Sequence, residues 1–220
     1  EQLWSFKFYT CSISDVKLNN FKHQLDNSNL SVNTEEGIKH VLCCKTERDK
    51  LIKCYKKINK DLNMTSLVVH HRPEGSARVE SCIARYNEFL PFCDQVCSGC
   101  FGYELIERDS NLRSTLLFGD IDLRHNLEGI ISHFSGRLND VLVCSAPHHG
   151  SKHSWDKQVF NYINDTNWIV SSGMHSRFGH PHYEVVSDFR EVYPDNRLLW
   201  NNEYTRVNVL MYVGCYSTKL

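Results

Sequence analysis

From Ser114 onward, short apolar runs alternate with segments of helical spacing. Each apolar run has the length and the β-branched content of a buried strand, and most are followed by a polar loop and by apolar residues at helical intervals. This alternation is typical of layered α/β folds, in which helices cover a sheet. The predicted strands are 114–118, 141–145, 168–171, 197–200 and 206–213, and the predicted helices are 125–138, 155–163 and 182–193.

The N-terminal part predicts a strand followed by helices. Residues 3–9 have strand character, residues 15–25 carry apolar side chains at helical spacing, and residues 35–62 fit one long or two short amphipathic helices. Residues 66–71 again predict a strand. We therefore expect an N-terminal strand and helix layer over residues 1–65, followed by an α/β part over residues 66–220.

Three of the predicted strands end in motifs rich in metal-binding side chains. The motifs are FGD at 118–120, APHHGS at 146–151 and FGHPH at 178–182. Neutral imidazole nitrogen and carboxylate oxygen are suitable ligands for Zn²⁺, Mn²⁺ or Fe²⁺. If the three strands lie in one sheet, these side chains meet at one edge of it. The sequence therefore predicts a metal site and, from it, metal-assisted hydrolysis.

Together these motifs resemble the second half of a metallo-β-lactamase-fold hydrolase, and they look most like the hydrolase domain of ComEC-type bacterial DNA-uptake proteins. The similarity spans about residues 63–213 and begins with NMTSLVV at 63–69. It implies a layered αββα sandwich, two divalent ions such as Zn or Mn, and phosphodiesterase or nuclease activity. In that family a short hairpin joins the strand at 66–71 to the strand before FGD, so residues 72–113 are expected to be an insertion.

The resemblance implies a role for each polar residue of these motifs. Asp120 is expected to bridge the two metals. The alternatives are that Asp120 is a structural turn residue, or that Asp122 is the ligand in its place. Adjacent histidines cannot both reach one metal without strain, so His149 is expected to bind metal and His148 to contact the substrate phosphate or transfer a proton. His180 is expected to complete the ligands, while Asp120, His148 and His149 carry catalysis.

Four further residues near the motifs are candidates for substrate binding. Ser151 and Lys152 can hold phosphate oxygens through a hydroxyl and an ammonium group. His182 is also typical of the start of a helix, because Pro181 before it is favoured in a first turn. The candidate substrate-binding residues are Ser151, Lys152, Arg177 and His182.

One motif of the family is missing from this chain. The motif H-x-H-x-D-H, which supplies most ligands of the two-metal centre, does not occur in the sequence. We expect that an N-terminal segment or a partner chain supplies these ligands, with true loss of the site as the alternative. The leading hypothesis is thus a metal-dependent hydrolase of phosphodiesters. Its rivals are a metal-poor relative that acts as a binding or regulatory module, and a hydrolase of a different ester.

The chain has ten cysteines, and four of them cluster in the expected insertion. Cys82, Cys93, Cys97 and Cys100 follow the spacing C-x10-C-x3-C-x2-C. Four thiolates can form a tetrahedral structural zinc site. The alternatives are reduced, unbonded cysteines, disulfides, or an iron–sulfur cluster.

Composition narrows the class of protein. Hydrophobic residues make up 41% and charged residues 23%, which is typical of a globular chain. The net charge of -1 provides no overall attraction to nucleic acid, so a nucleic acid or nucleotide substrate would need local contacts. No apolar run is long enough to span a membrane, and no signal peptide is evident. With its scattered single cysteines, the chain is expected to be cytoplasmic.

Overall fold

The structure is a computed structural model, and it describes residues 4–59, 63, 66–74, 78–87, 103–109, 113–164, 166–193 and 197–214. The chain divides into two compact units. The smaller unit, Thr10–Ser66, contains helices α1 (Asp15–Asn27), α2 (Glu35–Cys43) and α3 (Lys45–Tyr55). The larger unit joins Glu1–Tyr9 to Leu67–Leu220, so the first strand groups with the α/β part and not with the helices that follow it.

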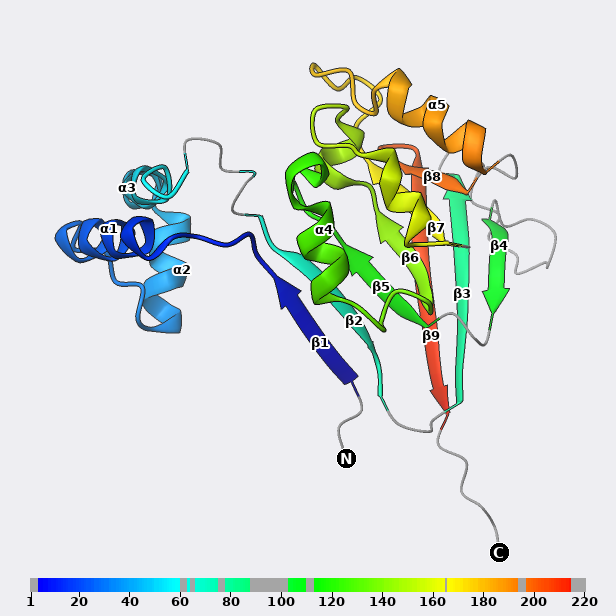
Figure 1. The fold of residues 1–220 in the computed structure, drawn as a ribbon, viewed down its shortest axis with the longest axis horizontal. Helices are drawn as coiled ribbons and strands as arrows, with labels where there is room; N and C mark the ends of the chain where they lie inside the picture. The colour runs from blue at the N-terminus through cyan, green and yellow to red at the C-terminus, as the bar shows by residue number, and fades with distance from the viewer. Residues whose placement is uncertain are drawn as a thin grey trace, which may run out of the picture. The chain divides into compact units, whose positions relative to one another are not determined.

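The larger unit is built on a six-stranded mixed sheet in the order β1-β2-β5-β6-β7-β8 (Figure 1). Strands β5, β6, β7 and β8 are parallel neighbours, whereas β1 and β2 are antiparallel to the strands beside them. The strands of this sheet are β1 (Trp4–Tyr9), β2 (Val68–Pro73), β5 (Ser114–Leu117), β6 (Val141–Ser145), β7 (Asn167–Ser171) and β8 (Leu198–Asn201). The predicted α/β class is confirmed.

A second sheet has three antiparallel strands in the order β4-β3-β9. Strands β3 (Arg78–Asn87) and β4 (Tyr103–Asp109) come from the segment expected to be an insertion, and β9 (Thr205–Gly214) ends the described chain. Strand β3 pairs with β9 along its whole length, from Arg78 opposite Gly214 to Asn87 opposite Thr205. Part of the expected insertion is therefore an integral layer of the larger unit.

The six-stranded sheet is covered on both faces. On one face, helices α4 (Leu123–His133) and α5 (Tyr183–Val192) pack on a core that is centred on the fully buried Trp168. On the other face, Val143 and Leu199 pack against Ile83 and Val209 of the second sheet. The layers are therefore helices, mixed sheet and smaller sheet. Among the described residues, no helix is both long and apolar enough to cross a membrane.

One predicted helix is shorter than its apolar pattern suggests. Residues 155–163 carry buried side chains at helical spacing, yet the chain forms only a five-residue 3₁₀ turn, η3 (Lys157–Asn161). The rings of Trp155 and Phe160 lie 5.7 and 5.9 Å from that of Trp168, so these apolar positions serve tertiary packing. The predicted helix at 155–163 is therefore wrong, because burial and not helical amphipathicity sets the spacing.

His70 is a fully buried histidine in strand β2. Its Nε2 lies 3.1 Å from the carbonyl oxygen of Arg137, which can only accept, so Nε2 carries the proton. Its Nδ1 is buried without a hydrogen-bond partner. Burial lowers the pKa of His70 to about 4, against the opposing influence of the Asp140 charge and the Arg137 carbonyl. Charging this ring in the folded state is therefore unfavourable.

We expect acid to destabilise the fold through His70. Above pH 6.5 the ring is neutral in both states; below it the unfolded chain binds a proton that the folded chain excludes until about pH 4. The stability contribution is lost as pH falls through this window and amounts to about 3 kcal/mol. Urea unfolding at pH 7 and pH 4 measures it. His70→Gln keeps a donor for Arg137 without titrating and should show a smaller loss; an equal loss in both proteins would contradict the prediction.

Candidate functional site

The three strand-end motifs meet at one edge of the six-stranded sheet. Strands β5, β6 and β7 are parallel neighbours, and their carboxyl ends point toward the same edge, as Figure 1 shows for β5 and β6. Backbone hydrogen bonds tie the loops together: the His148 amide donates to the Gly119 carbonyl at 2.8 Å and the His182 amide to the Gly150 carbonyl at 3.0 Å. The loops after these strands therefore form one connected scaffold.

The two adjacent histidines have an uncommon backbone. Both His148 (φ 45°) and His149 (φ 57°) are left-handed, within the 3₁₀ turn η2 (Pro147–Gly150). For a residue other than glycine this conformation costs about 1–2 kcal/mol. Such strain persists only where surrounding contacts enforce it, and it concentrates at functional sites. The strained turn directs the two rings differently: their planes differ by 65° and their centroids are 6.2 Å apart.

His149 is held by one ring nitrogen and directs the other toward Asp120. Its Nδ1 lies 2.6 Å from the carbonyl oxygen of Ser171, which can only accept, so Nδ1 donates. In the neutral ring, Nε2 then carries a lone pair. That Nε2 lies 3.8 Å from Oδ1 of Asp120. A backbone carbonyl that fixes the tautomer in this way is the usual arrangement behind a histidine metal ligand.

His180 lies next to both histidines of η2. Its ring centroid is 5.5 Å from that of His148 and 6.3 Å from that of His149. Burial is the main cause that lowers the pKa of His180, and the neighbouring His182 and His148 lower it further. His180 is thus neutral at neutral pH, which is the form that binds metal. The structure brings Asp120, His148, His149 and His180 together.

The neighbouring acid, Asp122, has a structural role. It is the N-cap of α4, where its side chain accepts from the Arg124 amide at 3.0 Å and contacts the Arg124 guanidinium at 2.7 Å and the His125 ring at 2.9 Å. Burial alone would raise the pKa of Asp122, but these bonds hold it below its usual value. The Asp122 carboxylate therefore serves as the cap of helix α4, whereas the half-exposed Asp120 faces His149.

Substitution of the two aspartates should change the unfolding free energy by different amounts. Asp122→Ala removes the helix cap and its bonds, so we expect unfolding free energy to fall by about 1–2 kcal/mol. Asp120→Ala should change it by less than about 0.5 kcal/mol, as is usual for a surface position. Urea denaturation compares the two variants. A larger loss for Asp120→Ala than for Asp122→Ala would show that the roles are reversed.

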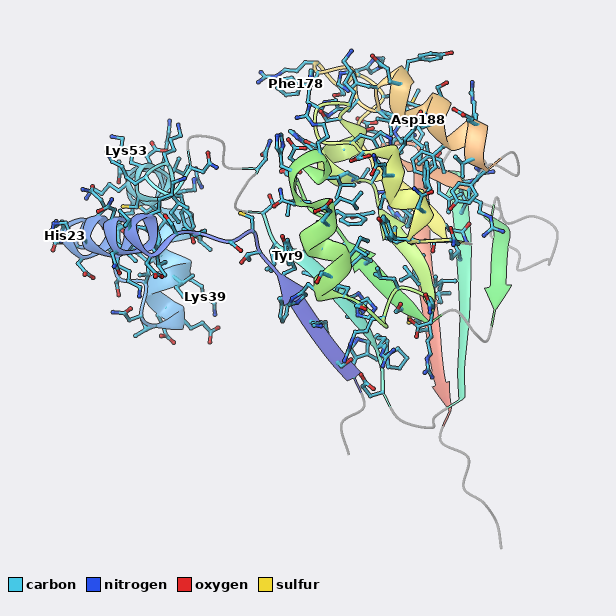
Figure 2. All side chains as sticks on the ribbon, in the orientation of Figure 1. Tyr9, His23, Lys39, Lys53, Phe178 and Asp188 are labelled. Carbon is cyan, nitrogen blue, oxygen red and sulfur yellow. The ribbon has the colours of Figure 1, made fainter. Side chains whose placement is uncertain are left out.

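The four candidate substrate-binding residues lie around the histidines but do not line the cavity beside them. Ser151 is buried, and its hydroxyl accepts from the His153 amide at 3.3 Å. Lys152 pairs with Glu184 at 2.6 Å. The guanidinium of Arg177 lies 4.5 Å from the ring centroid of the exposed Phe178, which Figure 2 labels. The remaining candidate, at position 182, is the N-cap residue of α5.

The cavity beside the histidines has a volume of about 620 Å³. His148, His149 and His180 line it, together with Asn201 at the end of β8 and Glu203 in the turn that follows. The Glu203 carboxylate accepts from the Met174 amide at 2.9 Å and so anchors the loop that leads to the histidine motif. Sequence analysis missed these residues; the run NNE between the last two predicted strands was the available signal.

Among the described residues, no group of three or more histidine, cysteine, aspartate or glutamate side chains could hold a metal ion as placed. The pair formed by Asp120 and His149 nevertheless fits one. Its separation of 3.8 Å is too long for a hydrogen bond, yet it is within the span of two metal–ligand bonds of about 2.1 Å each. The pair thus has a spacing that two donors of a divalent site could have, and such a site would need further ligands.

The predicted cysteine cluster falls outside the described part of the chain. Cys93, Cys97 and Cys100 are not described, and Cys82 is described only as a backbone position in β3. The structural zinc site therefore stays a prediction. Among the cysteines whose side chains are described, free thiols are carried by Cys43, Cys44, Cys54 and Cys144.

In comparisons with known proteins, no family model, curated protein or solved structure matches this chain.

Proposed function

We propose that Asp120, His149 and His180 are half of the metal centre of a phosphodiester hydrolase, in a layered αββα fold of the metallo-β-lactamase type. The observation that carries the proposal is the left-handed His149, whose Nδ1 is fixed by Ser171 and whose Nε2 faces Asp120 at 3.8 Å. In this proposal the other ligands come from an N-terminal segment or a partner chain. The complete site holds two ions, zinc or manganese.

Each of the four site residues has a separate role in this proposal. Asp120 and His149 would hold the metal through an oxygen and a nitrogen, and His180, whose pKa is lowered mainly by burial, would add a second nitrogen. His148 lies 3.1 Å from the Ser154 hydroxyl through Nδ1, and its ring lines the cavity, where it can contact a phosphate oxygen or move a proton to the leaving group. When bound, the metals would supply an activated water and stabilise charge on phosphorus.

A second candidate function has one observation in its favour. Among the described residues, no third ligand is in place beside Asp120 and His149. With His149 protonated, the two would form an ordinary ion pair. This edge of the six-stranded sheet would then be a binding surface of a metal-poor regulatory module. The two candidates differ in what the pair does when a divalent ion is present. A metal ligand pair should bind the ion, whereas a simple ion pair should not.

Metal titration of the full chain tests the proposal. Equilibrium dialysis against Zn²⁺ or Mn²⁺, followed by elemental analysis, should show weak binding that Asp120→Asn and His149→Gln remove. Asp156→Asn is the matched control, because Asp156 caps η3 through the Gln158 amide, away from the cavity, and asparagine also caps well. Absence of binding, or unchanged binding by Asp120→Asn, would leave the regulatory module as the better account.

A further inference from the structure

Strand β1 lies at an edge of the six-stranded sheet (Figure 1). In the described part of the chain it pairs with β2, in a register that runs without a shift from Trp4 opposite Pro73 to Tyr9 opposite Val68. An edge strand presents a row of backbone N–H and C=O groups to which a further strand can add. The regular pairing with β2 leaves β1 extended over all six residues, as strand addition requires.

The usual features that protect an edge strand are missing from β1. Proline, bulges and charged side chains normally prevent an edge from pairing with another chain. The sequence of β1, WSFKFY, has no proline, and its register with β2 has no bulge. Its one charged residue, Lys7, is engaged on the face of the sheet that α4 covers, where its ammonium group donates to the His133 carbonyl oxygen.

The other face of β1 carries exposed aromatic rings. Phe6 and Phe8 are 58% and 53% exposed, and their rings are nearly parallel, with centroids 6.4 Å apart and 8° between the planes. The His71 ring of β2 lies 5.5 Å from that of Phe6 and 5.9 Å from that of Trp4. Aromatic rings in such a row stabilise a sheet when an added strand brings aromatic partners opposite them.

The sequence of β1 provides those partners itself. Closed dimers have a two-fold axis, so a strand that pairs with its own copy does so antiparallel. With the axis at Phe6, the two Phe6 rings lie opposite each other, and Trp4 of each copy lies opposite Phe8 of the other. All three pairs are aromatic and lie on the same face of the sheet. The exposed row is therefore complementary to a second copy of itself.

The charges on the opposite face favour the same register. With the axis at Phe6, Lys7 of each copy lies opposite Ser5 of the other, and the Ser5 hydroxyl donates to the Glu74 carboxylate at 2.5 Å. An ammonium group of one copy thus comes near a carboxylate of the other. An axis at Lys7 would instead place two ammonium groups directly opposite, which destabilises a strand pair.

We propose that two copies of this chain associate through antiparallel pairing of β1 about Phe6, which joins their six-stranded sheets into one. The interface is independent of the histidine site and of the proposed hydrolase function. A strand of six residues is about 20 Å long. Its edge is smaller than a standard interface of about 800 Å² per partner, so the dimer should dissociate on dilution.

Sedimentation equilibrium of the full chain over a concentration series tests this inference. The unaltered chain should dimerise with a dissociation constant in the micromolar range. Phe6→Lys should weaken dimerisation by about tenfold, because it replaces an aromatic pair by two like charges at the axis. Phe178→Lys is the matched control, since Phe178 is similarly exposed, at 63%, but lies outside β1. Phe6 is exposed, so its substitution should leave the chain folded, which circular dichroism checks.

A mixture of two variants tests the register itself. Phe6→Lys and Phe6→Glu should each dimerise poorly, but together they should form a heterodimer about fivefold tighter than either homodimer, because opposite charges then meet at the axis. A chain that stays monomeric up to about 1 mM would overturn the inference. So would dimerisation of Phe6→Lys that equals that of Phe178→Lys, or a mixture that associates no better than its components.

Discussion

Gly150→Ala is expected to lower the unfolding free energy by about 3 kcal/mol, from left-handed strain and overpacking together. Gly150 has φ +78°, and an added Cβ would lie 2.8 Å from the Pro181 Cβ and 3.0 Å from the Val170 Cγ2. The Pro181 Cα would be only 3.2 Å away, so the backbone after His180 would have to move. The substitution should therefore also separate His149 from His180.

Gly136→Ala is the matched control for this prediction. Gly136 has nearly the same φ, +77°, but an added Cβ would meet nothing within 4 Å. Gly136→Ala should therefore show only the cost of a left-handed backbone at alanine, about 1 kcal/mol. Urea unfolding of the two variants isolates the packing contribution at Gly150. Equal losses would mean that the contact between the two loops does not constrain the histidines.

Asp120→Ala is expected to abolish phosphodiester hydrolysis once the missing ligands are restored. In the proposed site this carboxylate would be a metal ligand, so its removal should reduce turnover by far more than the roughly 10- to 100-fold that residues supporting a ligand contribute. Hydrolysis of bis(p-nitrophenyl) phosphate by the completed protein measures it. The 220-residue chain alone should show little activity, since Asp120, His149 and His180 cannot complete a two-metal centre.

Asp156→Asn again provides the control, and it should leave turnover unchanged because the Gln158 amide keeps its acceptor. Full activity in the isolated chain would show that no ligands are missing. Full activity after Asp120→Ala in the completed protein would remove this residue from the mechanism.

The parallel part of the sheet could be predicted from sequence because its signals are local. Each of the strands β5, β6 and β7 is a buried apolar run followed by a polar loop, and the structure places them within a few residues of their predicted bounds. In the smaller sheet the strand at 206–213 was predicted and corresponds to β9, but β3 and β4 were missed, for the opposite reason. Its central strand, Arg78–Asn87, pairs with Thr205–Gly214, far along the chain, and no local pattern encodes that pairing.

The convergence of Asp120 and His149 followed from the parallel strand order, but their finer geometry did not. The Ser171 carbonyl that fixes the His149 tautomer is a backbone group, which no residue pattern reveals. The sequence could not decide whether Asp120 or Asp122 is the candidate ligand. The structure shows that Asp122 caps helix α4, which leaves Asp120. The sequence suggested that Lys152 binds phosphate. In the structure its ammonium group pairs with Glu184, and the residue does not line the cavity.

Anomalous X-ray diffraction from crystals of the chain with saturating Mn²⁺ tests the central claim most directly. The account predicts an anomalous peak between Oδ1 of Asp120 and Nε2 of His149, within about 2.3 Å of both atoms, with His180 turned toward it. A map without a peak at this position would contradict the account if Mn²⁺ is seen elsewhere on the chain. It would also contradict the account if Asp120 instead forms a direct hydrogen bond to a protonated His149.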